Sequence, residues 1–438
     1  MRILYFISII LLSFNLMAQK PGIVTDSIIC KHDKSQTYAV YLPSNYTEDK
    51  KWPIVYFFEP AARGKVPVQL YAEVAEELGY ILACTNNSRN GSYDNSFKAA
   101  DAIFVDTESR FSIDNSRIIL SGFSGGSRLA LSIAVITKAA YGVIGVGAAQ
   151  PTVPHYMVLD RKNFKYAGLV GARDMNYLEH KTFQSLLNAL SMDNLLLVSN
   201  LKHNWATPSD FRIALLWMQM VERPNDPGKF YEALYSKITV EKDSIPLSDL
   251  IYMDELTMEK PLINEKDKNT KKLLREESKI INKEQGMVKA IQDSIASAFN
   301  LNSSNNRSLN WLLKKVGQIK NLKEKSSSLY EIMMYDRVLN YMSAACYETG
   351  LSMKARGLIK QALIGIAIWE AVTENRVYAN WLKARVYAQD KNTTLAIQHL
   401  EAALQSGKIQ KTTIFRESDF IHLHEQQLFK DLIESYYN

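Results

Sequence analysis

The chain has 438 residues, of which 47% are hydrophobic and 22% are charged. This composition is typical of globular protein and argues against a collagen-like, a mostly disordered or a polytopic membrane chain. At roughly 100 to 200 residues per domain, the length predicts two or more folding units. The net charge of +6 is too small a basic excess to indicate a nucleic-acid partner.

The first eighteen residues have the pattern of a secretory signal peptide. Arg2 gives a basic start, residues 3–14 are almost continuously apolar, and Leu16-Met17-Ala18 offers small or apolar residues before a cut at Gln19. The alternative is an uncleaved anchor, but the run is shorter than the roughly 20 residues that a spanning helix needs. We therefore predict an exported protein, periplasmic or secreted, without a membrane span after cleavage.

The chain contains three cysteines, Cys30, Cys84 and Cys346. They are too few and too scattered for a disulfide framework or a zinc site. An exported protein permits a bridge between Cys30 and Cys84, and two buried thiols on strands explain the same positions. The sequence leaves both options open and predicts no metal site.

Residues 19–225 alternate short apolar runs with longer helical segments. The predicted strands are Thr37–Leu42, Pro53–Phe58, Gly79–Cys84, Arg117–Gly122, Gly142–Gly147, Tyr166–Gly171 and Asn194–Ser199, and the predicted helices are Val66–Leu78, Ser96–Phe111, Gly125–Lys138, Tyr177–Leu190 and Ser209–Val221. Strands that are apolar on both faces and alternate with helices indicate an α/β domain with a mostly parallel sheet covered on both sides.

The pattern changes near residue 225. The turn-forming residues 223–228 mark a boundary, and residues 226–269 read as a linker whose part Asp243–Asn269 is an extended polar connector. Residues 270–438 are predicted to form an all-α domain, beginning with helices at Lys271–Phe299 and Ser308–Lys323 that are separated by a break at residues 302–306.

The helical half contains a weak internal repeat of small and large residues. They are Ala384, Tyr387, Ala396, Leu400 and Ala403, with Tyr347, Ala355, Ile359 and Ala362 one unit earlier. Their spacing resembles that of tetratricopeptide repeats, in which small residues let two antiparallel helices pack closely. An ordinary helical bundle is the alternative. The resemblance implies a protein partner that binds through the repeats.

A catalytic motif stands at Ser121–Gly126, where an apolar strand runs into the pentapeptide G-x-S-x-G centred on Ser124, followed by a helix. A nucleophilic serine on such a sharp turn is strained, and side chains in place of Gly122 and Gly126 would collide with the neighbouring strand and helix. The positive end of the following helix and the N–H of Gly125 would stabilise an oxyanion. A turn without catalytic function is the alternative.

This element resembles the α/β-hydrolase family, in which a serine, an acid and a histidine follow one another along the chain. That order leaves His155, His180 and His203. Only His203 follows the last predicted strand and leads into a final helix, as the family implies for the base. The pattern His203-x-Trp205 resembles exported esterases related to polyhydroxybutyrate depolymerases, although here the proline is displaced to Pro208.

The same resemblance implies an acid after the strand Tyr166–Gly171. Asp174 occupies that place, and Asp160 is a distant second choice. Asp174 would accept the imidazole N–H and stabilise the cation that forms when the histidine takes the serine proton. The alternative is that Asp174 only caps the helix that follows.

The second oxyanion donor is expected in the loop after the strand Pro53–Phe58. Many relatives have a His-Gly pair after the third strand, but here the strand is followed by Glu59-Pro60-Ala61, and proline has no N–H. The second donor is then Ala61 or, failing that, Glu59. Glu59 would disfavour an oxyanion unless it points away or pairs with Arg63.

The polar cluster at residues 85–93 follows another strand at the same edge of the sheet, where ligands bind in open α/β folds. Asn87 and Arg89 are candidate substrate-binding residues, together with Trp205; a surface turn is the alternative. The resemblance implies an exported serine hydrolase, most simply an esterase for small or polymeric esters, without cofactor or metal. A peptidase of the same fold and an inactive envelope protein that binds partners are the alternatives.

Overall fold

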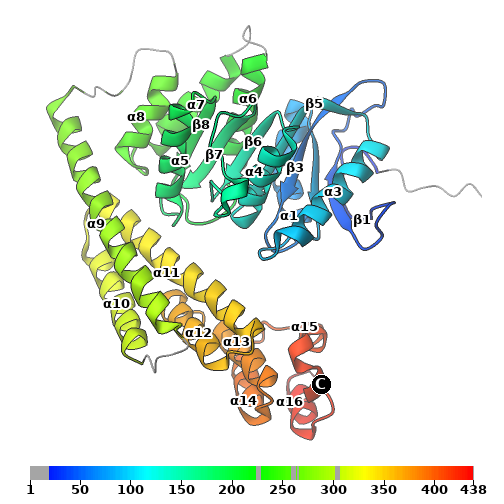
Figure 1. Ribbon diagram of the computed structural model, residues 1–438, viewed down its shortest axis with the longest axis vertical. Coiled ribbons are helices and arrows are strands. Elements are labelled where there is room, and N and C mark those ends of the chain that lie inside the picture. Colours follow the sequence, from blue (N-terminus) through cyan, green and yellow to red (C-terminus); the bar gives the residue numbers. More distant parts are fainter. Residues whose placement is uncertain (1–18, 223–227, 258–262, 264–265, 301–305, 438) are drawn as a thin grey trace, which may run out of the picture. The chain divides into compact units, whose positions relative to one another are not determined.

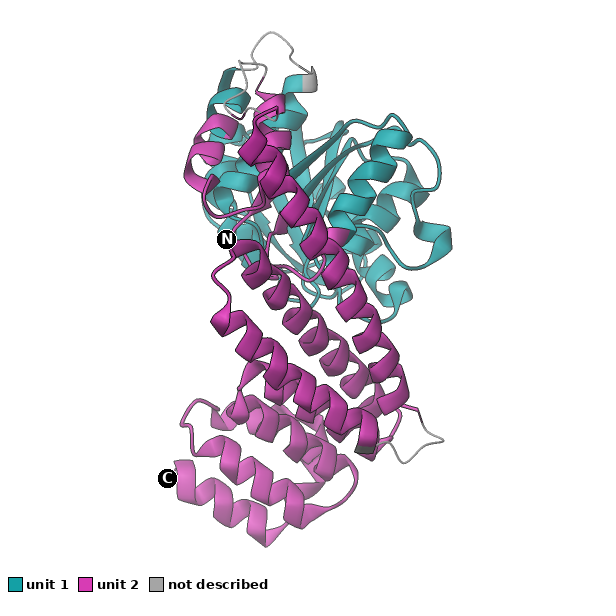
Figure 2. Ribbon diagram, turned by 90° about the vertical axis from the view of Figure 1, so that its left-hand side faces the viewer, with its two compact units in different colours: residues 1–169, 179–197, 205–233 teal, residues 170–178, 198–204, 234–438 magenta. Residues whose placement is uncertain are grey.

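The protein is described here by a computed structural model that covers residues 19–222, 228–257, 263, 266–300 and 306–437 (Figure 1). The predicted signal peptide, most of the boundary turn at 223–228 and most of the break at 302–306 lie outside these residues. The chain divides into two compact units (Figure 2). The first comprises residues 1–169, 179–197 and 205–233, and the second comprises residues 170–178, 198–204 and 234–438.

Eight strands within the described residues form one sheet, in the order β1-β2-β4-β3-β5-β6-β7-β8. They are β1 (Thr25–Ile29), β2 (Thr37–Tyr41), β3 (Trp52–Phe58), β4 (Ile81–Thr85), β5 (Ile113–Phe123), β6 (Gly142–Val146), β7 (Lys165–Gly171) and β8 (Asn194–Ser199). Strand β2 is antiparallel to β1 and β4, whereas β3 pairs in parallel with β4 and β5, and β6 with β5 and β7. Strands β3, β4 and β6 are buried throughout, as two covered faces require.

Alternate residues of β3 point to opposite faces of the sheet. Ile54, Tyr56 and Phe58 pack in a core with α3 (Tyr93–Arg110), α4 (Gly125–Thr137) and α5 (Tyr177–Ala189). On the other face, the Phe57 ring lies 5.6 Å from Tyr71 and 5.5 Å from Phe211, between centroids. Tyr71 joins α1 (Lys65–Leu70) to α2 (Ala72–Leu78), and Phe211 belongs to α6 (Pro208–Glu222). Helices therefore cover both faces.

All seven predicted strands are present, and β1 was not predicted. It is an edge strand in which only Ile28 is buried, so it has no apolar run to mark it. The single helix predicted over Val66–Leu78 is divided at Tyr71, whose backbone leaves the helical conformation. The Tyr71 hydroxyl donates to the Ala206 carbonyl at 2.9 Å, which fixes this buried ring at the break.

The prediction of an extended connector over Asp243–Asn269 is wrong for its first part. Residues 228–241 form α7 (Gly228–Glu241), and after Pro246 the chain forms α8 (Leu247–Leu256), in which Leu250, Ile251 and Met253 are buried. Two prolines and many charges suggested a linker, but both prolines lie outside α8, and its apolar residues pack as a helix face.

The second unit continues with helices of 6 to 31 residues. They are α9 (Lys268–Ala298), α10 (Asn306–Lys325), α11 (Leu329–Ala355), α12 (Ile359–Thr373), α13 (Arg376–Gln389), α14 (Thr393–Leu404), α15 (Lys411–Arg416), the 3-10 helix η2 (Ser418–Leu423) and α16 (Gln427–Tyr437). The predicted fold class, a mostly parallel α/β sheet followed by a helix-rich region, is confirmed.

The residues of the predicted repeat lie on α11 to α14. Ala362, Ala384, Ala396, Leu400 and Ala403 are fully buried in one helical core. Helices α11 and α12 approach so closely that a Cβ on Gly365 would lie 2.5 Å from the Cys346 carbonyl oxygen. Small residues thus stand where helices touch, and the assignment to tetratricopeptide repeats stays a prediction.

Cys30, Cys84 and Cys346 are buried free thiols in the structure. Of the two predicted options, the structure therefore has buried thiols at Cys30 and Cys84 and not a bridge between them. Within the described part of the chain, no helix is long and apolar enough to cross a membrane.

Candidate active site

Ser124 stands at the end of β5 in a strained backbone conformation. Its φ is 54° and its ψ is −119°, a region that residues other than glycine rarely adopt. The Ser124 N–H donates to the Val146 carbonyl at 2.8 Å, and α4 starts at the next residue. Such strain persists only where the surroundings enforce it, and it turns this side chain out of both the strand and the helix.

Gly122 and Gly126 stand where the sequence predicts that a side chain would collide with its neighbours. A Cβ on Gly122 would lie 2.3 Å from the carbonyl carbon and oxygen of Gly126. A Cβ on Gly126 would lie 1.9 Å from the Phe58 carbonyl oxygen on β3. The first contact is with the start of the helix and the second with the neighbouring strand, so the predicted collisions are confirmed.

Asp174 and His203, both in the second unit, form a hydrogen-bonded pair. The distance from His203 Nδ1 to Asp174 Oδ2 is 2.9 Å. The Asp174 side chain is fully buried, whereas 21% of the His203 side chain is exposed. A buried carboxylate hydrogen-bonded to Nδ1 of a partly exposed imidazole is the arrangement found in a catalytic acid–base pair.

Asp174 also uses its second oxygen locally. Oδ1 accepts the Asn176 N–H at 2.8 Å, just before α5 begins at Tyr177. This contact lies within the loop, one residue before α5 begins, so the capping role that the sequence offers as an alternative stays a prediction. The two oxygens serve different partners, and together they fix the orientation of the carboxyl group.

The other candidate acid, Asp160, and the other two histidines, His155 and His180, lie in surroundings unlike those of the acid–base pair. The Asp160 side chain is 74% exposed and pairs with Lys162. His155 is exposed in a short 3-10 helix, η1 (Pro154–Tyr156). His180 is buried in α5 beneath β7, where a Cβ on Gly168 would lie 2.8 Å from its Nδ1.

The structure corrects the assignment of Ala61 as the second oxyanion donor. The Ala61 N–H donates to Glu59 Oε2 at 2.7 Å and is therefore occupied. Arg63 pairs with the other oxygen, its Nη2 lying 2.5 Å from Oε1, so the predicted pairing of Glu59 with Arg63 is found. The carboxylate of Glu59 is fully buried and turned onto its own loop. Gly125, the other predicted oxyanion donor, is the first residue of α4. The N–H groups at the start of a helix have no intrahelical partners.

The polar cluster after β4 divides into structural and cavity-lining residues. Asn87 accepts the Thr37 N–H at 2.8 Å and donates to the Ser35 carbonyl at 3.3 Å, so it ties this loop to the start of β2. Its predicted role in substrate binding stays a prediction. Arg89 lines a cavity of about 90 Å³ together with Asn90 and Gly125. This cavity lies beside residues 122–126, which we call the nucleophile turn.

Asn90 is the residue of this cluster that sequence reasoning passed over. Its Oδ1 lies 1.8 Å from the point where a Cβ on Gly125 would stand, so it fills the space that this glycine leaves. Its own N–H donates to the Pro60 carbonyl at 2.9 Å, which joins the loop after β4 to the loop after β3. The Asn90-Gly91 pair, a common turn sequence, was the available signal.

Trp205 is 8% exposed and belongs to an aromatic group on one face of the sheet. Its ring lies 5.5 Å from Phe123, 6.1 Å from Phe57 and 6.1 Å from Tyr71, between centroids. Phe123 directly precedes Ser124. Trp205 therefore packs behind the nucleophile turn, and its predicted role in substrate binding stays a prediction.

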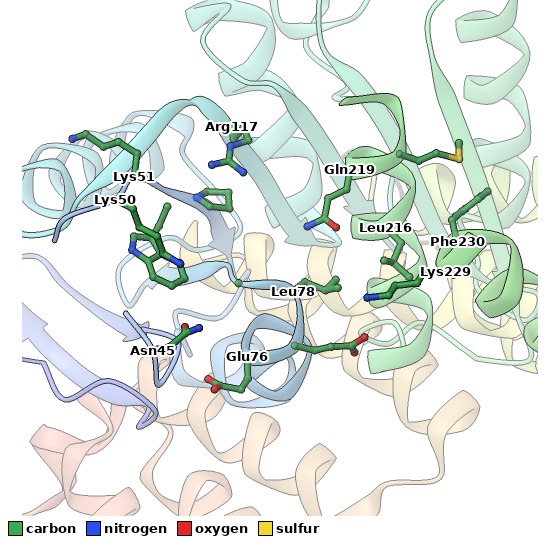
Figure 3. A pocket seen from close by; sticks show the side chains of 15 residues that line it. Asn45, Lys50, Lys51, Glu76, Leu78, Arg117, Leu216, Gln219, Lys229 and Phe230 are labelled. Atoms are coloured by element: carbon green, nitrogen blue, oxygen red, sulfur yellow. The ribbon is translucent and has the colours of Figure 1, made fainter. Parts of the chain in front are cut away.

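A larger cavity, of about 440 Å³, lies elsewhere in the first unit (Figure 3). Trp52, Gly79 and Arg117 line it, at or near the amino ends of β3, β4 and β5, together with Lys50, Lys51 and Lys229. Ser124 follows the opposite end of β5, roughly 20 Å along the strand from Arg117 at about 3.3 Å per residue. This cavity is therefore separate from the nucleophile.

Within the described residues, no group of three or more His, Cys, Asp or Glu side chains could hold a metal ion.

No protein-family model matches the chain, and no curated protein matches it. Among solved structures, it is similar to the S-formylglutathione hydrolase of Staphylococcus aureus, with 13% identity, a TM-score of 0.37 and coverage of 45% of this chain and 95% of that one. The fluorophosphonate-binding serine hydrolase F of Staphylococcus aureus has 13% identity and a TM-score of 0.37, and the match covers 45% of this chain and 98% of that one. The Pyrobaculum calidifontis esterase has 13% identity and a TM-score of 0.35, and the match covers 51% of this chain and 88% of that one. These values are too low to assign an activity to the chain.

Proposed function

We propose that this protein is a serine hydrolase that cleaves carboxylic esters through an acyl-serine intermediate. The observation that carries the proposal is the strained backbone of Ser124, held between two glycines that nothing larger could replace. A structural turn has no need of a serine with positive φ, whereas a nucleophile gains exposure from it.

The acid–base pair supports the same chemistry. Asp174 and His203 follow β7 and β8, and β7 runs parallel to the strand that ends at Ser124, with β6 between them. Loops that follow parallel strands leave a sheet at one edge. On this basis we assign Ser124, His203 and Asp174 to one catalytic triad.

The reaction follows from these roles. His203 takes the proton of Ser124 through Nε2 while its Nδ1–H donates to Asp174, and the serine oxygen attacks the ester carbonyl. The Gly125 N–H donates to the resulting oxyanion. His203 then returns the proton to the departing alcohol. A water molecule, deprotonated by the same histidine, attacks the acyl carbonyl, and the histidine gives that proton to the serine oxygen as the acid leaves.

A fluorophosphonate probe and p-nitrophenyl esters of graded chain length test the proposal. The wild type should be labelled covalently and should hydrolyse an ester, and Ser124→Ala should abolish labelling and lower turnover by several orders of magnitude. Asp174→Asn should lower kcat by a factor on the order of 10⁴.

The matched control is Ser132→Ala. Ser132 lies on the same helix, α4, and its hydroxyl donates to the Arg128 carbonyl. This variant should be labelled like the wild type. A wild type that is not labelled, or a Ser124→Ala variant that still is, would overturn the proposal, and faster cleavage of peptides than of esters would reassign the substrate class.

Export belongs to the proposal as well. The basic and apolar pattern of residues 1–18 supports a periplasmic or secreted enzyme.

A further inference from the structure

The loop that carries Asp174 is held by a helix distant in sequence. We call residues 172–176, between β7 and α5, the acid loop. Arg337 of α11 donates from Nη1 to the Ala172 carbonyl at 2.6 Å. Its guanidinium carbon also lies 4.7 Å from the ring centroid of Tyr177, the residue directly after the loop. One side chain thus contacts the chain on both sides of Asp174.

Arg337 is itself fixed by a buried partner. Its Nε lies 2.8 Å from Glu284 Oε1 and its Nη2 lies 2.5 Å from Oε2, a bidentate pair with α9. Both side chains are almost fully buried, with 4% and 3% of their surface exposed. This geometry locks the guanidinium plane and leaves Nη1 directed at the Ala172 carbonyl.

The next turn of α11 supplies a second contact. Asn340, three residues after Arg337, donates from Nδ2 to the Arg173 carbonyl at 3.0 Å. Residues three apart lie on the same face of a helix. The carbonyl groups of two consecutive loop residues, directly before Asp174, are therefore bound by one face of α11.

The acid loop is joined in turn to the loop that carries His203. The Ala172 N–H donates to the Ser199 carbonyl at 2.8 Å, and the Arg173 N–H donates to the Leu201 carbonyl at 3.0 Å. A shift of Ala172 or Arg173 would therefore displace both members of the acid–base pair. The backbone of these two residues connects α11 to the pair.

The energetics of a buried ion pair indicate a role other than stability. Taking both charges out of water costs about as much as their attraction returns, so an apolar pair of similar volume is often equally stable. Arg337 also binds a loop carbonyl, which an apolar residue could not do. The contact that distinguishes this arginine from an apolar residue is thus the one to the acid loop.

We propose that Arg337 and Asn340 are positioning residues, which hold the acid loop so that Asp174 keeps its hydrogen bond to His203. The inference rests on the proposed triad. It gives the helical half of the chain a function in catalysis, although the proposed triad residues lie outside that half.

The test uses the full chain and two independent variants. In the first, Arg337→Met is combined with Glu284→Leu, which removes the ion pair without leaving a buried charge unpaired. The second, Asn340→Leu, removes one contact and keeps the ion pair. Each should lower kcat for a p-nitrophenyl ester roughly 10- to 100-fold, with KM within about twofold, because misplacement of a catalytic group by about 1 Å has that effect.

The conservative variant Arg337→Lys should retain part of the activity. Lysine keeps a charge beside Glu284 but has one nitrogen in place of the planar fork, so it cannot serve both Glu284 oxygens and the Ala172 carbonyl. Its kcat should lie between the wild type and the double variant. This graded order separates positioning from a general loss of folded protein, which would lower the amount of active enzyme and leave kcat per labelled site unchanged.

Arg385→Met is the matched control. Arg385 is also a helical arginine with acidic partners, Asp419 at 2.9 Å and Glu417 at 3.0 Å, and no residue of the acid loop is among them. Its kcat should equal that of the wild type.

Hydrogen exchange provides a readout that does not need activity. Amides of residues 170–178 should exchange faster in both variants and at the wild-type rate in Arg385→Met. If the wild type neither hydrolyses esters nor reacts with the fluorophosphonate, the proposed function fails. If the wild type is active and the folded double variant and Asn340→Leu keep its kcat, the positioning role is refuted.

Discussion

The closest contact with a main-chain atom in the nucleophile turn gives a quantitative prediction. Gly126→Ala would place a carbon 1.9 Å from the Phe58 carbonyl oxygen and 2.7 Å from the carbonyl carbon. The shortest ordinary carbon–oxygen contacts are about 3.3 Å, so the start of α4 and the end of β3 would have to separate by roughly 1.4 Å. Both are main-chain atoms, so no side-chain rotation can relieve the clash.

The expected cost is at or above the upper end of the roughly 1–3 kcal/mol typical of overpacked cores. The reason is that Phe58 is fully buried and its strand is paired on both sides, with β4 and with β5. The free energy of unfolding from urea denaturation, followed by circular dichroism, measures this cost. The rate of fluorophosphonate labelling should fall in parallel, because the displaced backbone carries Ser124.

The control is Gly286→Ala. Gly286 is an exposed glycine inside α9, and a Cβ there would have no atom within 4 Å. Alanine should stabilise this helix by about 0.5–1 kcal/mol, since it has the higher helix propensity. A Gly126→Ala variant as stable as the wild type, or a destabilised Gly286→Ala variant, would refute the steric reasoning.

Two further predictions concern titratable groups. Burial raises the pKa of Asp106, but hydrogen bonds from Arg110, the Lys31 N–H and Tyr38 outweigh it and leave the pKa below its usual 3.8. Its contribution to stability is therefore present above about pH 4 and is lost as pH falls through the lowered pKa, so Asp106→Asn should flatten the acid side of a plot of unfolding free energy against pH; an unchanged profile would contradict this. Burial also raises the pKa of the thiols, to about 11 for Cys30, to about 12 for Cys346 and well above the usual value for Cys84. A thiol reagent at pH 8 should thus find no reactive cysteine in the native protein and three after denaturation, whereas a count of one after denaturation would indicate a Cys30–Cys84 bridge.

The sequence predicted those parts of the fold that have a local signal. Strands such as Tyr166–Gly171 are apolar on both faces, so an unbroken apolar run marks them. Edge strand β1 buries only Ile28, and α8 lies between prolines and charges, so composition concealed both. The nucleophile turn was predictable because its constraints lie within five consecutive residues, Gly122 to Gly126.

The surroundings of the site depend on contacts between residues far apart in the chain. The occupied N–H of Ala61 depends on the rotamer of Glu59, which residue order cannot specify. Asn87 and Asn90 share one polar cluster, and only the path of the loop decides that Asn90 fills the space beside Gly125. Arg337 is 165 residues from Ala172, and nothing in its own neighbourhood indicates that contact.

The separation of 165 residues between Ala172 and Arg337 means that the acid loop is synthesised well before the helix that binds it. A chain made at about 5–20 residues per second exposes the acid loop roughly 8 to 33 seconds before Arg337 is synthesised. During this interval β5 and the nucleophile turn already exist, but the acid loop lacks the helix that binds it. A chain that stops before α11 is therefore left with an acid loop lacking its bonds to Arg337 and Asn340, however well its sheet has folded.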